Sequence, residues 1–159
     1  MSNSDSHPPV RHRAPVPIDQ CPMAAAVELF GDRWSMLILR EAFYGVVRHA
    51  DFRDDLRVPR SVLTDRLNKL VHDGLLEKTE YREQGARARH AYGLTTKGHA
   101  LAPTFIAMTE WGVEHCLGGQ SPVDIIDRES GQGLRVALVD EDGKEQPLSR
   151  IALKVKGPD

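Results

Sequence analysis

Residues 60–74 constrain the fold of this chain more than any other stretch. Read as an α-helix, they place Leu63, Leu67 and Leu70 on one face, at the i, i+4, i+7 spacing of a buried stripe. The opposite face is polar and carries Ser61, Asp65, Asn68 and His72. Gly74 supplies a C-terminal stop. Taken alone, this pattern is equally compatible with an ordinary amphipathic helix whose polar face is solvated and with a helix that reads a binding partner.

Helical patterns also precede this stretch. The spacing of apolar residues predicts a first helix that stops at Gly31, and Asp32 is a fitting N-cap for a second helix. A third, shorter helix is expected over residues 48–56. Pro59 disfavours helix at the residue before it and suits the start of the next helix. Successive helices with tight turns, the last of them polar outside, indicate a helix-turn-helix core.

Two strand-like segments follow, at residues 75–81 and 90–94. The loop between them brings three arginines, Arg82, Arg87 and Arg89, to the tip of the expected hairpin. Such a tip suits contact with DNA phosphates or insertion into a minor groove. Solvated surface arginines are the alternative, and the polar-faced helix beside the hairpin favours DNA. The expected fold class is mainly α with a β-hairpin wing, a winged helix-turn-helix.

The distribution of charge agrees with this interpretation, although the net charge of −2 alone argues against a nucleic-acid partner. Residues 48–98 contain 11 Lys/Arg and 8 Asp/Glu, a local charge of +3. The remaining residues contain 10 basic and 15 acidic side chains, or −5, which restores the total of −2. The positive excess therefore lies in the segment that contains the polar-faced helix.

Several classes of protein are excluded or disfavoured. Cys21 and Cys116 are the only two cysteines and lie far apart, which excludes a disulfide framework. The seven histidines show no metal-ligand spacing, and no Ser/His/Asp set or glycine-rich phosphate loop occurs. We therefore expect no metal, no cofactor and no enzymatic activity. Without a long apolar run or the apolar core of a signal peptide, we expect no membrane partner and a cytoplasmic protein.

The chain before residue 117 is expected to form two parts. Residues 1–20 contain four prolines and almost nothing to bury, and are expected to be a disordered arm. Residues 21–116 form the winged helix-turn-helix domain. Its last helix, over residues 100–116, is apolar enough to suggest a partner subunit that covers it. Pro103 either starts or kinks that helix.

The third part, residues 117–159, is expected to be a small β-rich extension. Apolar and polar residues alternate over residues 134–138 and 151–155, the period of half-buried strands. Asp142-Gly143 is a turn signal between them. The fold class is thus completed by a small C-terminal β appendage.

Taken in order, the motifs resemble those of the HxlR-type regulators, bacterial winged-helix transcription factors related to the MarR group. The matching stretches are Cys21-Pro22, Trp111-Gly112 and residues 31–39, 48–52, 62–70, 73–75 and 92–98. The resemblance implies a homodimer, built from the first and last helices, that binds a roughly palindromic operator in double-stranded DNA. Some members carry a C-terminal extension with the paired cysteines of a zinc ribbon. Here Asp127, Ser130, Val139 and Asp142 stand at similar spacing, so a zinc site is not expected.

The resemblance also implies which residues contact DNA. Those expected to read base edges are Ser61, Thr64, Asp65 and Asn68. Those expected to contact DNA phosphates, from the helix or from the wing, are Arg60, Arg66, Lys69, Arg82, Arg87 and Arg89. Arg66 lies nearer the apolar face, where anchoring its own helix is the alternative. Asp65 and Pro59 depart from the residues most common in the family, and we expect them to shape the sequence preference.

Two features suggest that the protein responds to a chemical signal. Cys21 matches a cysteine that some family members use to sense oxidants, and its place before a helix N-terminus favours the thiolate, with a structural role as the alternative. A cavity near Trp34, Phe105, Met108 and Trp111 would admit an apolar effector, with a packed core as the alternative. The predicted function is a dimeric repressor that responds to a small molecule or a redox signal. The alternative is a ligand- or thiol-sensing interaction protein without DNA binding.

Overall fold

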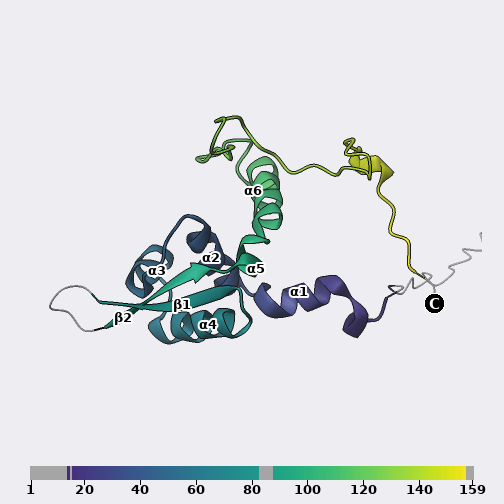
Figure 1. The fold of residues 1–159 in the computed structure, drawn as a ribbon. Coiled ribbons are helices and arrows are strands. Elements are labelled where there is room, and N and C mark those ends of the chain that lie inside the picture. The colour runs from purple at the N-terminus through teal and green to yellow at the C-terminus, as the bar shows by residue number, and fades with distance from the viewer. Residues whose placement is uncertain (1–13, 15, 83–87, 157–159) are drawn as a thin grey trace, which may run out of the picture.

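The computed structural model describes residues 14, 16–82 and 88–156. The elements, in chain order, are η1 (Ile18–Gln20), α1 (Pro22–Phe30), α2 (Arg33–Phe43), α3 (His49–Leu56), α4 (Arg60–His72), β1 (Leu76–Tyr81), β2 (Arg89–Leu94), α5 (Thr96–His99), α6 (Ala102–Cys116) and η2 (Leu148–Arg150). Helices α2 to α5 and the hairpin form one packed body, while α1 and α6 project from it (Figure 1). The mainly α fold with a β-hairpin wing is confirmed. No described helix is both long and apolar enough to span a membrane.

The core forms where the apolar stripes of three helices meet the hairpin. Leu63, Leu67 and Leu70 of α4 are fully buried, which confirms the predicted inner face of that helix. They pack in one cluster with Ile38 and Leu39 of α2, Phe52 of α3, and Leu76 and Tyr92 of the hairpin. Because these side chains occupy the inner face of α4, its polar face is directed outward.

The ends of the central helices follow the predicted capping residues. The Asp32 carboxylate accepts hydrogen bonds from the amides of Trp34 and Ser35, as an N-cap does. Gly74 ends α4 with a φ of 72°. Its amide donates to the Val71 carbonyl, and the next amide, that of Leu75, donates to Leu70, which is the Schellman pattern. Asp32 therefore starts α2, and Gly74 ends α4 shortly before β1 begins at Leu76.

Helices α3 and α4 form the helix-turn-helix pair. The turn between them contains Arg57 in the left-handed conformation, with a φ of 50°, and the buried Val58. Pro59 is the N-cap residue of α4 and provides no side-chain cap. The short turn, anchored by Val58 in the core, fixes the angle at which α4 presents its polar face.

The wing is a two-stranded antiparallel hairpin whose register runs from Leu76 opposite Leu94 to Tyr81 opposite Arg89. The middle of β2 is bonded to the loop before α3, because the Tyr92 amide donates to the Val47 carbonyl over 2.8 Å. Through this link the hairpin and α3 hold a defined position beside α4.

The helix predicted over residues 100–116 forms as α6, and a short helix that was not predicted, α5, precedes it. The Thr95 side chain caps the short α5 by accepting from the Gly98 amide. A Cβ atom at Gly98 would lie 2.2 Å from the Leu75 carbonyl oxygen, so this close approach requires glycine. Helix α6 begins at Ala102 with Pro103 in its first turn, and the proline therefore starts the helix rather than kinking it.

The predicted C-terminal β appendage is wrong for the described residues. The segments 134–138 and 151–155 form no strands there, and pairing in the extension is limited to the isolated bridges Ile126–Gly133 and Val139–Glu145. Leu134 remains 51% exposed and Leu153 97% exposed, so the alternating apolar residues have no layer to pack against. So few exposed pairs do not offset the entropy of ordering a sheet. The Asp142-Gly143 turn does form, with a φ of 78° at the glycine.

The predicted N-terminal arm falls mostly outside the described residues. Residues 1–13 and 15 are not described, and η1 at Ile18–Gln20 leads directly into α1. The boundaries 1–20, 21–116 and 117–159 remain predictions.

Candidate nucleic-acid interface

The outward face of α4 presents three of the four residues expected to read base edges. Ser61, Asp65 and Asn68 are exposed. Thr64 is half-buried, and its hydroxyl donates to the Arg60 carbonyl one turn earlier, over 2.9 Å. The exposed polar surface of α4 therefore carries Ser61, Asp65 and Asn68, whereas the Thr64 hydroxyl is hydrogen-bonded within the helix.

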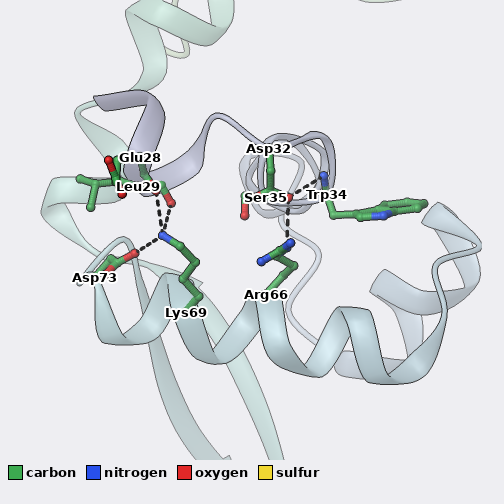
Figure 2. A network of polar contacts seen from close by, with 8 residues as sticks. All are labelled: Glu28, Leu29, Asp32, Trp34, Ser35, Arg66, Lys69 and Asp73. Carbon is green, nitrogen blue, oxygen red and sulfur yellow. Dashed lines mark hydrogen bonds and ion pairs between the residues drawn. The ribbon is translucent and has the colours of Figure 1, made fainter. Parts of the chain in front are cut away.

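Lys69 and Arg66 are bound within the protein (Figure 2). The Lys69 ammonium donates to the carbonyl oxygens of Glu28 and Leu29, at 3.1 and 2.8 Å, and to the Asp73 carboxylate at 2.6 Å. The Nε atom of Arg66 lies 3.1 Å from a carboxylate oxygen of Asp32, as an ion pair. Both cations thus tie α4 to the neighbouring helices, which is the anchoring alternative for Arg66.

The Asp32 carboxylate joins two roles, as N-cap of α2 and as ion-pair partner of α4. Burial alone would raise the pKa of Asp32. Hydrogen bonds from Ser35 and Trp34, together with the Arg66 guanidinium, outweigh burial and hold that pKa below its ordinary value. Asp32 therefore stays ionised and keeps its connection to α4 at neutral pH.

The remaining expected phosphate contacts lie at the start of α4 and on the wing. Arg60, Arg82 and Arg89 are all exposed. Arg87 lies outside the described residues, so its placement stays a prediction. Among the described residues, no carboxylate is within ion-pair distance of Arg60 or Arg89, which leaves these two cations available to an external anion.

Four further basic residues that the sequence did not lead us to expect, Arg48, His49, Arg53 and His90, join Arg60 and Arg89 at this surface. We use the name basic cleft for the hollow of about 540 Å³ lined by Arg48, His49, Arg53, Arg60, Arg89 and His90. It lies where the beginnings of α3 and α4 meet the loop end of the paired strands, at Tyr81, Arg89 and His90. No sequence periodicity brings residue 49 next to residue 90, so only the strand register and the α3–α4 turn reveal the cluster.

His49 connects the basic cleft to α4. Its Nε2 atom lies 3.2 Å from the hydroxyl of Thr64. Burial of the imidazole, and then the charges of Arg60 and Arg53, lower the pKa of His49 below its ordinary value. The neutral ring is therefore the dominant form of His49 at neutral pH.

Comparison of the sequence with models of known protein families agrees with the helix-turn-helix fold and with this surface. The sequence profile described as HxlR-like helix-turn-helix matches residues 29–119, which is more than half of the chain. The chain belongs to the HxlR-like helix-turn-helix family. This confirms the resemblance, and the family is one of helix-turn-helix regulators rather than of enzymes.

Curated relatives of this HxlR-like chain are named as uncharacterised HTH-type transcriptional regulators. One from Mycobacterium tuberculosis is 39% identical over 97 residues, which is 61% of this chain and 60% of the relative. One from Synechocystis is 36% identical over 93 residues, 58% of this chain and 67% of the relative. The chain thus spans about 60% of the length of the mycobacterial relative.

Solved structures share the fold. PA1607, described as a candidate transcription factor, is 31% identical with a TM-score of 0.73, covering 86% of this chain and 95% of its own. The redox regulator HypR in its oxidised form is 26% identical with a TM-score of 0.55, covering 60% of this chain and 97% of its own. The transcriptional regulator YodB from B. subtilis, reduced, is 28% identical with a TM-score of 0.52, covering 63% and 98%. Because 86% of 159 residues exceeds the 116 that precede the extension, the match to PA1607 includes part of the extension.

The residues expected to sense a signal lie apart from this interface. Cys21 is a half-buried free thiol at the N-cap position of α1, and Cys116 is an exposed free thiol at the end of α6. The structure does not gather the expected effector residues in one cavity: Phe105 and Met108 line an open groove of about 410 Å³ between α6 and α2. Met108 also lines a neighbouring groove with Trp111.

The fourth expected effector residue, Trp34, packs against the core instead, with the Arg33 guanidinium 4.9 Å from its ring centre. Among the described residues, no group of three or more His, Cys, Asp or Glu side chains is placed to hold a metal ion.

Proposed function

We propose that this protein is a dimeric, sequence-specific DNA-binding regulator of transcription, a cytoplasmic repressor that responds to a small molecule or a redox signal. The observation that carries this proposal is the outward polar face of α4, flanked by the basic cleft and by the exposed arginines of the wing. Family membership supports the class of function, since the relatives are named as transcriptional regulators.

Helix α4 would enter the major groove, with the wing over the adjacent backbone or minor groove. Ser61, Asp65 and Asn68 would contact base edges. The Asp65 carboxylate is a hydrogen-bond acceptor and would favour a cytosine amine, while it would repel phosphate. Arg60, Arg82, Arg87 and Arg89 would hold phosphates; Thr64, Arg66 and Lys69 would contribute by fixing the position of α4.

The proposed homodimer rests on the two projecting helices. No residue of α1 or α6 is buried within the described chain. Met23 on α1 and Trp111 on α6 are 73% and 61% exposed, and Val27 and Met108 extend these apolar faces. A second copy would cover them. Two-fold symmetry would then place two α4 helices about 34 Å apart, on the half-sites of a pseudo-palindromic operator.

The proposed redox signal would act at Cys21, because this thiol lies at the start of α1 and the similar HypR is described as a redox regulator. The groove at Phe105 and Met108 would serve a small apolar effector. Both features lie on or beside the proposed dimer helices, so either signal would act on the spacing of the two α4 helices.

A gel shift with the intergenic DNA upstream of the gene tests the function. We expect a salt-sensitive shift that unlabelled DNA of the same sequence displaces better than unrelated DNA. Oxidant is expected to change the affinity of the wild type and to leave Cys21→Ser unaffected. If no DNA shifts even at low salt, the regulator proposal is wrong, and a sensing or interaction protein without DNA binding becomes the better reading.

A further inference from the structure

The basic cleft has the charge and shape of an anion site. It contains four arginines, Arg48, Arg53, Arg60 and Arg89, against the single carboxylate of Asp51. Arg53 is paired with Asp54, a neighbour on the surface of α3. Arg60 and Arg89 have no such partner among the described residues. Within the described part of the chain, Arg60 and Arg89 therefore contribute positive charge to the lining that no carboxylate pairs with.

The hydrogen bonds around His49 define which ring nitrogen is free to gain a proton. The Thr64 hydroxyl gives its proton to the Arg60 carbonyl, so toward His49 its oxygen acts as an acceptor. The Nε2 atom of His49 is then the donor, and Nδ1 is the unprotonated nitrogen of the neutral ring. A proton taken up at Nδ1 leaves the bond to Thr64 intact.

We propose that the basic cleft binds one backbone phosphodiester of duplex DNA, and that His49 takes up a proton at Nδ1 when the phosphate binds. This inference rests on the proposed DNA-binding function and adds to it a specific phosphate site and a proton. A phosphodiester carries a single negative charge and accepts hydrogen bonds from guanidinium and imidazolium groups. Arg60 and Arg89 lie on the two elements, α4 and wing, that would straddle the same strand.

The sign of the pH dependence follows from the surroundings of His49. The charged or titratable groups that line the cleft with it are Arg48, Asp51 and Arg53 at α3, Arg60 on α4, and Tyr81, Arg89, His90 and Tyr92 on the wing. In the free protein, burial and then the charges of Arg60 and Arg53 lower the pKa of His49 and so disfavour the imidazolium. A bound phosphate has the opposite effect and raises the pKa of His49. Binding therefore takes up a proton between the two pKa values, and the affinity falls as pH rises through that window.

The phosphate site is tested by fluorescence anisotropy with a labelled 30-base-pair duplex of arbitrary sequence, because a backbone contact does not depend on the operator. We expect Arg60→Gln and Arg89→Gln each to weaken binding about eightfold at 0.1 M salt, because the slope of log Kd against log salt falls by about 0.9 for each lost phosphate contact. Arg150→Gln, on the extension, is the matched control and is expected to bind as the wild type does. Both cleft variants are exposed substitutions, and circular dichroism checks that they fold.

The proton is tested by repeating the titration between pH 5.5 and 8 at constant ionic strength. The wild type is expected to show log Kd rising with pH, with a slope of up to about +1. His49→Gln is expected to lose most of this slope, whereas His115→Gln on α6 retains it. A slope that persists in His49→Gln and disappears in His90→Gln would overturn the assignment to His49.

Two other outcomes overturn the site itself. If the wild type binds the duplex but Arg60→Gln and Arg89→Gln bind equally well, the cleft is no phosphate site, although the regulator proposal stands. If the wild type binds no duplex at low salt, both proposals fail. A site for free phosphate would instead be occupied by 10 mM inorganic phosphate without DNA, seen as a shift of the His49 ring signals in NMR, and that result would reject the duplex assignment.

Discussion

The Nζ atom of Lys69 lies 2.8 Å from the carbonyl oxygen of Leu29. This hydrogen bond joins α4 to the last turn of α1, where carbonyl groups have no partner within their own helix. A positive charge at this end also complements the dipole of α1. The helix that would read DNA is thereby fastened to the helix that would contact a second copy.

Replacing Lys69 by Met keeps most of the apolar stem and removes the ammonium. We expect the free energy of unfolding to fall by about 1–2 kcal/mol, since bonds to two carbonyls and to Asp73 are lost from a partly exposed site. Urea denaturation measures this change. Lys154→Met, in the extension, is the control with no expected effect. A fully stable Lys69→Met protein with weakened DNA binding would show that Lys69 serves phosphate instead.

Two substitutions separate the roles of Asp32. Asp32→Ala removes the N-cap and the partner of Arg66 and is expected to cost about 1–2 kcal/mol. Asp32→Asn retains a cap and loses only the charge, so its cost should be smaller, in keeping with a partly exposed ion pair. Equal costs for the two variants would contradict a capping role.

The charge of Asp32 also predicts a pH dependence. Because its pKa is lowered in the folded protein, its stabilising contribution is complete above the ordinary value of 3.8 and is lost as pH falls through the folded pKa. The stability difference between wild type and Asp32→Asn should therefore be constant near neutral pH and shrink below about pH 4. Urea melts across this range measure it, and a difference that grows on acidification would be inconsistent with the lowered pKa.

Gly98 is expected to tolerate no side chain. In Gly98→Ala the new Cβ would meet the Leu75 carbonyl oxygen at 2.2 Å, which is backbone and cannot rotate away. We expect a loss of about 1–3 kcal/mol, the usual cost of overpacking. Gly133→Ala is the control, because a Cβ at Gly133 would meet no atom within 4 Å. Thermal denaturation of both variants shows whether the loss of stability comes from the clash with the Leu75 carbonyl oxygen or from the replacement of a glycine as such.

Trp111→Glu tests the proposed dimer. The side chain is 61% exposed, so the fold of one chain should survive while the apolar face of α6 gains a charge. We expect the dimer to dissociate at concentrations at least about tenfold higher than for the wild type, because an unpaired buried charge is costly. Sedimentation velocity measures this, with Leu153→Glu as an exposed control. An unchanged dimer would move the interface away from α6.

The pattern of residues 60–74 contained enough information to predict α4, its buried leucines and its stop. Local chemistry likewise predicted the Asp32 cap and the two strands of the wing within a residue. It failed where packing decides: an alternating pattern at residues 134–138 predicts a strand only if another layer covers one face, and the described chain supplies none. It also gave no reason to single out His49, whose neighbours come from three elements.

The sequence by itself determined helices α1 to α4, the wing and α6, because helical periodicity, caps and turn residues act over a few neighbouring positions. The tertiary structure alone decided what the polar side chains of α4 do. It binds Lys69 to α1, Arg66 to Asp32 and Thr64 to His49, and it leaves Ser61, Asp65 and Asn68 exposed at the surface. The reason is geometric: residues 40 positions apart meet only when the core has fixed the angles between their helices.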